Sequence, residues 1–146
     1  MRKRLAVLAA AKAMVQAALP AADIRGMDND EAKPIRVGAQ GLGIVRSGDP
    51  GTPEIDLSPP TWWWEHRIPI ELAGYEVAGK TSQQALDEMI AAIDARRRAD
   101  PTLGGLCIYL DAEPPTDGET ETVGTTVLGW ADFALVASYS TDSPLG

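Results

Sequence analysis

Reactive side chains are scarce in this sequence, which has one cysteine, Cys107, and one histidine, His66, among 146 residues. A lone cysteine cannot form an internal disulfide, and with a single histidine it offers few ligands for a metal cluster. No apolar run approaches the roughly 18 residues that span a bilayer. We therefore expect no metal, no cofactor and no membrane partner, and a protein made in a reducing cytoplasm.

Basic residues are also in the minority, with 13 Lys and Arg against 21 Asp and Glu and a net charge of −8. Nucleic acids and anionic membranes attract clusters of Lys and Arg, so this balance opposes general affinity for either. The length is close to the commonest domain size. We predict one domain over residues 1–146.

The N-terminus partly imitates a secretory signal, because Arg2, Lys3 and Arg4 precede an alanine-rich apolar run. Lys12 interrupts that run, and the larger apolar residues gather on one arc of a helix, opposite the polar ones. This pattern favours an amphipathic docking helix that ends before Pro20.

The clearest structural signal is the alternation from Trp62 to Ala73, which predicts a long half-buried strand. Pro69 cannot donate to a ladder, so we expect that part of the strand at a sheet edge or a bulge. The residues at even-numbered positions are predicted to face the core, namely Trp62, Trp64, His66, Ile68, Ile70 and Leu72.

The remaining elements follow from periodicity and from turn residues. Thr81 with Gln84 has the spacing of a capping box, so a helix begins there, and Asp100-Pro101 ends it. The acidic stretch from Asp111 to Glu121, rich in Pro, Thr and Gly, predicts an exposed loop. We further expect a charged turn over 28–33, a strand pair at 35–37 and 43–46 around a turn at Gly38 and Gly41, a loop over 47–53, and a last strand over 127–139. These elements favour a small α/β domain.

His66 and Cys107 are the candidate reactive groups, and both are better explained as buried residues. His66 shares its parity with Trp64 and Ile68, which indicates a core histidine with a hydrogen-bonded ring nitrogen. Cys107 lies between Leu106 and Ile108, which favours an inert thiol. The glycines of 38–43 lack the order of a dinucleotide loop, and the acidic stretch lacks the ligand spacing of a calcium loop.

Surface residues are the remaining functional candidates. Trp63 points to the face opposite its two tryptophan neighbours, so it is either covered by the N-terminal helix or exposed as an interface anchor, and both options stay open. Three consecutive arginines fan around a helix axis, so we expect them to pair with carboxylates of this or a neighbouring chain. The predicted interface residues are Ser47, Asp49, Pro53, Trp63, Arg96, Arg97, Arg98, Glu113, Asp117 and Glu119.

Several segments together resemble the tail terminator proteins of long-tailed bacteriophages, especially the versions in alphaproteobacterial prophages and gene transfer agents. The similarity runs nearly end to end, and the run Asp100-Pro-Thr-Leu-Gly-Gly-Leu106 is its most diagnostic piece. It also includes the alanine-rich opening helix of 1–19, the strand ending at 68–72, the segment 93–107, the strand 130–136 and the tail from Ser143.

The resemblance implies an α+β fold, with a mainly antiparallel sheet flanked by the N-terminal helix and a central helix. It implies a structural virion protein that forms a hexameric ring at the head-proximal end of the tail tube. Such a ring ends tube polymerisation and joins the tail to the head connector, and DNA only passes through its lumen. The implied partners are other copies of the chain, the tail tube protein and the connector or stopper protein. None of the shared motifs is catalytic.

Three alternatives remain. A head–tail stopper or tail-completion protein is close in role. A small acyl-transfer enzyme would use Cys107 or His66. A soluble ligand-binding module would have an apolar pocket beside Trp62 and Trp64.

Overall fold

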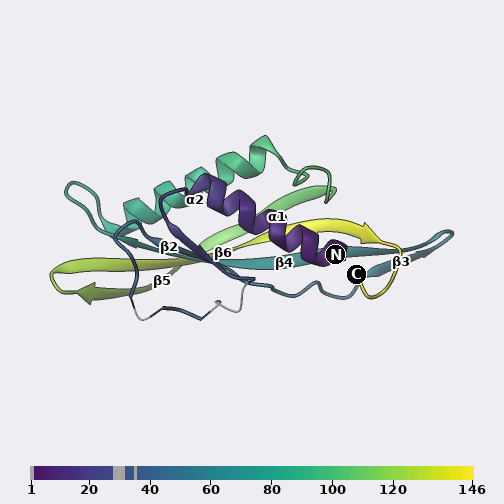
Figure 1. The fold of residues 1–146 in the computed structure, drawn as a ribbon, viewed down its shortest axis with the longest axis horizontal. Coiled ribbons are helices and arrows are strands. Elements are labelled where there is room, and N and C mark those ends of the chain that lie inside the picture. The colour runs from purple at the N-terminus through teal and green to yellow at the C-terminus, as the bar shows by residue number, and fades with distance from the viewer. Residues whose placement is uncertain (1, 28–31, 35) are drawn as a thin grey trace.

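The computed structural model describes residues 2–27, 32–34 and 36–146, apart from the side chain of Asp117. The described residues form two helices and six strands, and both helices lie on the same side of one sheet (Figure 1). An α+β fold is therefore confirmed. The elements are α1 Lys3–Ala18, β1 Asp23–Arg25, β2 Leu42–Val45, β3 Glu54–Leu57, β4 Pro60–Tyr75, α2 Ser82–Ala99, β5 Tyr109–Val123 and β6 Thr126–Thr141.

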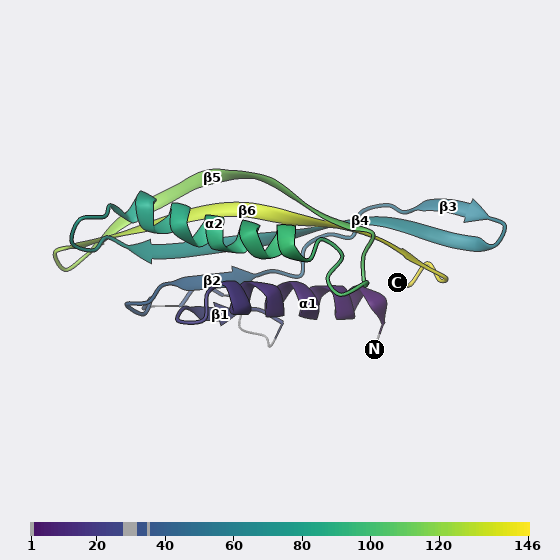
Figure 2. The ribbon, with the colours of Figure 1, turned by 90° about the horizontal axis from the view of Figure 1, so that it is seen from above.

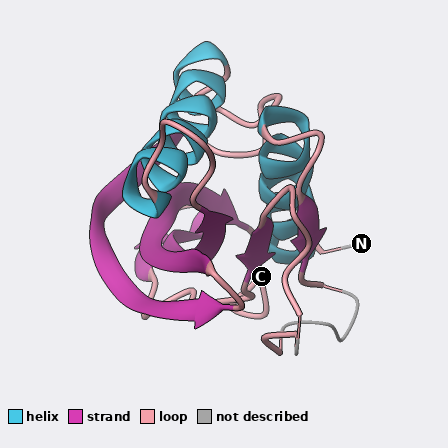
Figure 3. Ribbon diagram, turned by 90° about the vertical axis from the view of Figure 1, so that its left-hand side faces the viewer, coloured by secondary structure: helices cyan, strands magenta, loops and turns pink. Residues whose placement is uncertain are grey.

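The sheet has the strand order β1-β2-β4-β6-β5, and β3 pairs with the start of β4. Only the β1·β2 pair is parallel, so the mainly antiparallel sheet with two flanking helices is as expected. Seen from its end, the sheet curls beneath the helices (Figure 3). The curvature gives it a helix-covered face, which carries the main hydrophobic core, and an outer face.

Strand β4 confirms the predicted alternation. His66, Ile68, Ile70 and Leu72 have no exposed surface, and Trp64 is buried as well. The strand pairs with β6 continuously from Trp62 opposite Thr141 to Tyr75 opposite Leu128. Because successive side chains alternate between faces, the other parity forms the outer face, namely Trp63, Glu65, Arg67, Pro69 and Glu71.

Pro69 does not lie in an edge strand, since β4 has β6 on one side and β2 on the other. Its ring nitrogen faces the β2 side just beyond Val45, the last residue of β2. There Arg46 donates its amide to the Pro69 carbonyl, 3.0 Å away. The proline is tolerated because the regular ladder has already ended at this position.

The two helices form as predicted and pack on the sheet. In α1, Val7, Leu8, Ala11 and Val15 are buried, so its apolar arc docks on its own chain. Helix α2 begins with the predicted capping box. The Thr81 side chain accepts from the Gln84 amide, while the Gln84 side chain accepts from the Thr81 amide.

The predicted strand over 35–37 is wrong for its two described residues, 36 and 37, because neither lies in a strand. Instead β1 pairs with β2. The turn at Gly38 and Gly41 is confirmed by a hydrogen bond between them, and Tyr75 anchors the segment through the Val37 carbonyl. The predicted charged turn falls mostly on residues 28–31, which with Ile35 lie outside the described residues.

The predicted acidic loop is also wrong, because Asp111 to Glu121 lie within β5, an edge strand along β6. The ladder is irregular between Glu113 and Thr116, where two prolines occur, and again between Asp117 and Thr120. Most side chains of β5 are exposed and bury little surface. The strand is therefore held in place mainly by its backbone hydrogen bonds to β6.

Residues 54–63, which we call the arm, form a hairpin of β3 and the start of β4. The arm extends past the N-terminal end of α1 (Figure 2). All four residues of β3 are exposed, including Leu57 at 79%. The sequence patterns did not predict β3, because its four residues are too few to show a period.

Candidate assembly surfaces and the buried reactive side chains

His66 lies at the centre of a buried hydrogen-bond network. Its Nε2 is 2.7 Å from the carbonyl oxygen of Ser47, and its Nδ1 is 3.0 Å from the hydroxyl of Tyr139. A carbonyl only accepts, so Nε2 carries the hydrogen, and Nδ1 accepts from the tyrosine. The core position is confirmed, but both ring nitrogens are bonded rather than one. A general base would have to give up the Tyr139 hydrogen bond to accept a proton.

Burial lowers the pKa of His66 below its ordinary value of 6.5, and the nearby Arg4 lowers it too, whereas the hydrogen bond to Ser47 and the charge of Asp49 raise it. The folded chain therefore favours the neutral imidazole. The unfolded chain takes up the proton first as pH falls, so this contribution to stability is complete above about pH 6.5 and is lost as pH falls through the lowered pKa.

Acidification below about pH 6.5 is accordingly expected to destabilise the fold, with a slope of up to about 1.4 kcal/mol per pH unit from His66. Urea unfolding at a series of pH values, on the wild type and on His66→Gln, measures this slope. The variant keeps every carboxylate, so the difference between the two profiles isolates the histidine. Identical profiles would contradict the prediction.

Cys107 is buried, as expected, with 6% of its surface exposed. Burial raises the pKa of its thiol, and the negative charge of Asp100 raises it further. Its sulfur faces the carbonyl of Pro101 at 3.8 Å. Because the thiolate is the nucleophilic form, this environment disfavours reactivity.

Among the described side chains, no three of His, Cys, Asp and Glu gather in a way that could hold a metal ion. In the same part of the chain, neither helix has the length and apolarity to cross a membrane.

The predicted loop over 47–53 is attached to the sheet at its first half. Ser47 accepts from His66, and Asp49 exchanges two backbone hydrogen bonds with Arg67. The Asp49 carboxylate also accepts from the amide of Gly51. Pro53 then leads directly into β3.

Trp63 lies on the outer face of the arm with 38% of its surface exposed, so the N-terminal helix does not cover it. Its Nε1 donates to the Asp56 carboxylate across the hairpin, at 2.8 Å. Of the two sequence interpretations, exposure is the one observed. The bond to Asp56 holds the indole plane in a fixed orientation.

The three arginines of α2 do fan apart. Arg96 donates to the Ala17 carbonyl of α1 at 3.4 Å, whereas Arg97 reaches the Leu110 carbonyl of β5. Arg97 and Arg98 both pair with Asp94, each at 2.9 Å. Of the two that pair with Asp94, Arg98 is the more exposed, with 73% of its side chain accessible against 14% for Arg97.

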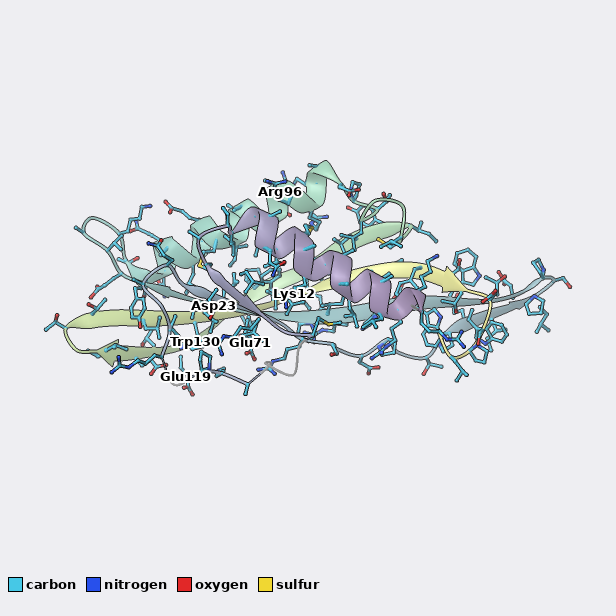
Figure 4. The ribbon with its side chains drawn as sticks, in the orientation of Figure 1. Lys12, Asp23, Glu71, Arg96, Glu119 and Trp130 are labelled. Atoms are coloured by element: carbon cyan, nitrogen blue, oxygen red, sulfur yellow. The ribbon has the colours of Figure 1, made fainter. Side chains whose placement is uncertain are left out.

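The acidic residues of β5 lie apart from these arginines. Glu113 pairs with Arg67 of β4 at 2.8 Å, across the intervening β6. Glu119 is exposed. Figure 4 shows Arg96 on the helical side of the molecule and Glu71, Trp130 and Glu119 on the opposite side. The side chain of Asp117 lies outside the described structure.

The structure thus separates the predicted interface residues into two groups on opposite faces of the sheet. The basic group lies at the end of α2 on the helix-covered face. The second group comprises Trp63, the 47–53 loop and the acids of the outer face. Sequence reasoning missed Glu54 and Asp56, which hairpin pairing brings beside Trp63, and Glu65, which lies two residues further along β4 on the same face. No protein-family model matches the chain, and no curated protein matches it.

Proposed function

We propose that this chain is a structural virion protein, a tail terminator that assembles as a hexameric ring at the head-proximal end of the tail tube. The ring would end tube polymerisation and join the tail to the head connector, with DNA only passing through. The chain would be made in the cytoplasm of a bacterial host and would end in the virion, as part of a phage or a gene transfer agent.

The observation that carries the proposal is the presence of two different surfaces on opposite faces of one sheet. A closed ring needs heterologous contacts, in which one patch of a subunit meets a different patch of the next. Here a projecting acidic arm with an exposed tryptophan lies on one side, and a helical face ending in exposed arginine lies on the other. A subunit with these features can contact two neighbours at once.

The segment that carries the resemblance most strongly also has a structural role. Asp100 ends α2, and its carboxylate accepts from the amide of Gly104 and the hydroxyl of Thr102. Leu103, at a positive φ of 49°, is buried in the core. This turn leads the chain from α2 to the edge strand β5, so its residues support the fold rather than a reaction.

The charge of the outer face suits a passage for DNA. Two arginines, Arg46 and Arg67, are each engaged by a glutamate there. A ring multiplies the net charge of −8, and an acidic lumen repels phosphates so that DNA slides without sticking. The carboxylates of this face away from the arm include Glu71, Asp111, Glu113 and Asp132.

Deleting the gene tests the proposal. We expect the mutant to produce heads without tails and tail tubes of irregular length in electron micrographs, because nothing ends polymerisation. Wild-type protein and Cys107→Ala should both restore joined particles of uniform tail length. Tubes of normal length that fail to join would instead support a stopper. Failure of a folded Cys107→Ala to complement would support acyl transfer, and absence of the chain from purified particles would refute a virion role.

A further inference from the structure

On the side of β4 that faces away from β6, the hydrogen-bonded ladder is interrupted at Glu65. Odd-numbered residues of β4 direct their backbone groups to this side, as the paired hydrogen bonds between Arg67 and Asp49 show. Trp63 is opposite Glu54 of β3. Between these two pairs, Pro50 to Pro53 leave the ladder, and no described strand residue lies opposite Glu65 on this side. Its carbonyl is therefore directed toward the space beside the loop.

A cavity of about 440 Å³ occupies that space. Its walls include Trp63, Glu54, Glu65 and the loop from Pro50 to Thr52. Neither glutamate forms an ion pair with any described residue. An indole face, two carboxylates and an unpaired carbonyl form a set that attracts positive charge and accepts hydrogen bonds but donates little.

The ligand chemistry that best fits this set is a guanidinium group. Its planar cation stacks on an aromatic ring while its N–H groups donate in plane to carboxylate and carbonyl oxygens. An ammonium group is more strongly hydrated and cannot stack in the same way. The bond from Trp63 to Asp56 leaves the indole face, rather than its N–H, for such contact.

Arginines on the outer face of the same copy are engaged elsewhere. Arg67 is directed across β6 to Glu113, and Arg46 pairs with Glu71 at 2.8 Å. Arg98 also forms an ion pair, with Asp94, but its side chain is 73% exposed, against 52% for Arg67 and 31% for Arg46. It belongs to α2 on the helix-covered face and cannot reach the outer face of its own sheet. A head-to-tail neighbour can bring the two faces together.

We propose that the cavity beside Trp63 binds the guanidinium of Arg98 from a second copy of the chain. The contact is heterologous, and charge complementarity selects it, because the segment from Ser47 to Pro60 has three acids and no base whereas the last turn of α2 has three arginines. It rests on the proposed ring, for which it names one contact between neighbouring subunits.

Titration of the full-length chain with N-acetyl-arginine amide tests the site itself. The indole N–H signal of Trp63, identified by its loss in Trp63→Phe, should shift saturably in NMR spectra. The matched control is N-acetyl-citrulline amide, which has nearly the same shape without the charge and should shift it little. Equal shifts with both compounds, or none with either, would overturn a guanidinium site.

Charge reversal tests the second copy. Glu65→Arg and Arg98→Glu should each weaken self-association, measured by sedimentation equilibrium, by roughly tenfold or more, and the double variant should recover much of the loss. Lys80→Glu, a reversal at another exposed cation, is the control and should have little effect. Single variants that match this control, a double variant without recovery, or a chain that stays monomeric throughout would overturn the contact.

The outcomes separate this inference from the proposed function. If particles contain a ring of the chain but charge reversal changes nothing, the contact is wrong and the function stands. If arginine binds beside Trp63 but the chain is missing from particles, the site stands and the virion role does not.

Discussion

Replacing His66 by alanine is expected to lower the free energy of unfolding by about 4 kcal/mol. The side chain has no exposed surface, so its removal leaves a cavity in the core. It also removes the hydrogen bond to the buried Tyr139 hydroxyl and the one to the partly buried Ser47 carbonyl. Guanidinium unfolding followed by tryptophan fluorescence measures the loss.

Tyr139→Phe is the matched control for this prediction. It removes one hydrogen bond of the same network and keeps the ring, so we expect a loss of about 1 kcal/mol. A loss for His66→Ala no greater than that of the control would show that the network contributes little. The comparison also separates the packing contribution of the imidazole from its hydrogen bonds.

Replacing Gly48 by alanine is expected to destabilise the chain by about 3 kcal/mol and to detach the 47–53 loop from β4. Gly48 has a φ of 67°, where a side chain is strained. In addition, a Cβ here would overlap the Arg67 carbonyl oxygen, at 1.9 Å. Backbone atoms cannot rotate away as a side chain does, so the loop itself must move.

Gly51→Ala in the same loop isolates the effect of this overlap. Gly51 has a similar φ of 74°, but its Cβ would meet only the Glu65 carbonyl oxygen at 3.7 Å, an ordinary contact. It should therefore cost about 1 kcal/mol, from backbone strain alone. Hydrogen exchange of the Arg67 amide, which donates to Asp49, should accelerate in Gly48→Ala only. Equal effects of the two variants would contradict the steric argument.

Local signals explain which elements could be predicted. The alternation of β4 and the capping box of α2 are determined by residues close in sequence, and both appear as expected. Strand β5 was predicted as a loop because its prolines, threonines and acids have low strand propensity. Its order comes from pairing with β6, which composition does not report. The same limit applies to β1 and β3, which are short and take their shape from neighbouring strands.

The same distinction applies to the candidate surface residues, some of which could be identified from the sequence and some only from the structure. Trp63 and the arginines of α2 stand out by residue type, so they could be identified without a structure. The carboxylates around Trp63 could not, because Glu54 meets it only through hairpin pairing. The gap at Glu65 depends on where the loop leaves the ladder, which no local pattern reveals.

The continuity of β4 has a mechanical consequence. One uninterrupted strand leads from the arm to Ala73, and no glycine that could serve as a hinge occurs before Gly74, near the end of β4. Along most of this length the strand is fastened to β6 by backbone hydrogen bonds. A load applied to the tip of the arm is therefore transmitted as tension or tilt through the whole sheet, and the chain behaves as a stiff lever.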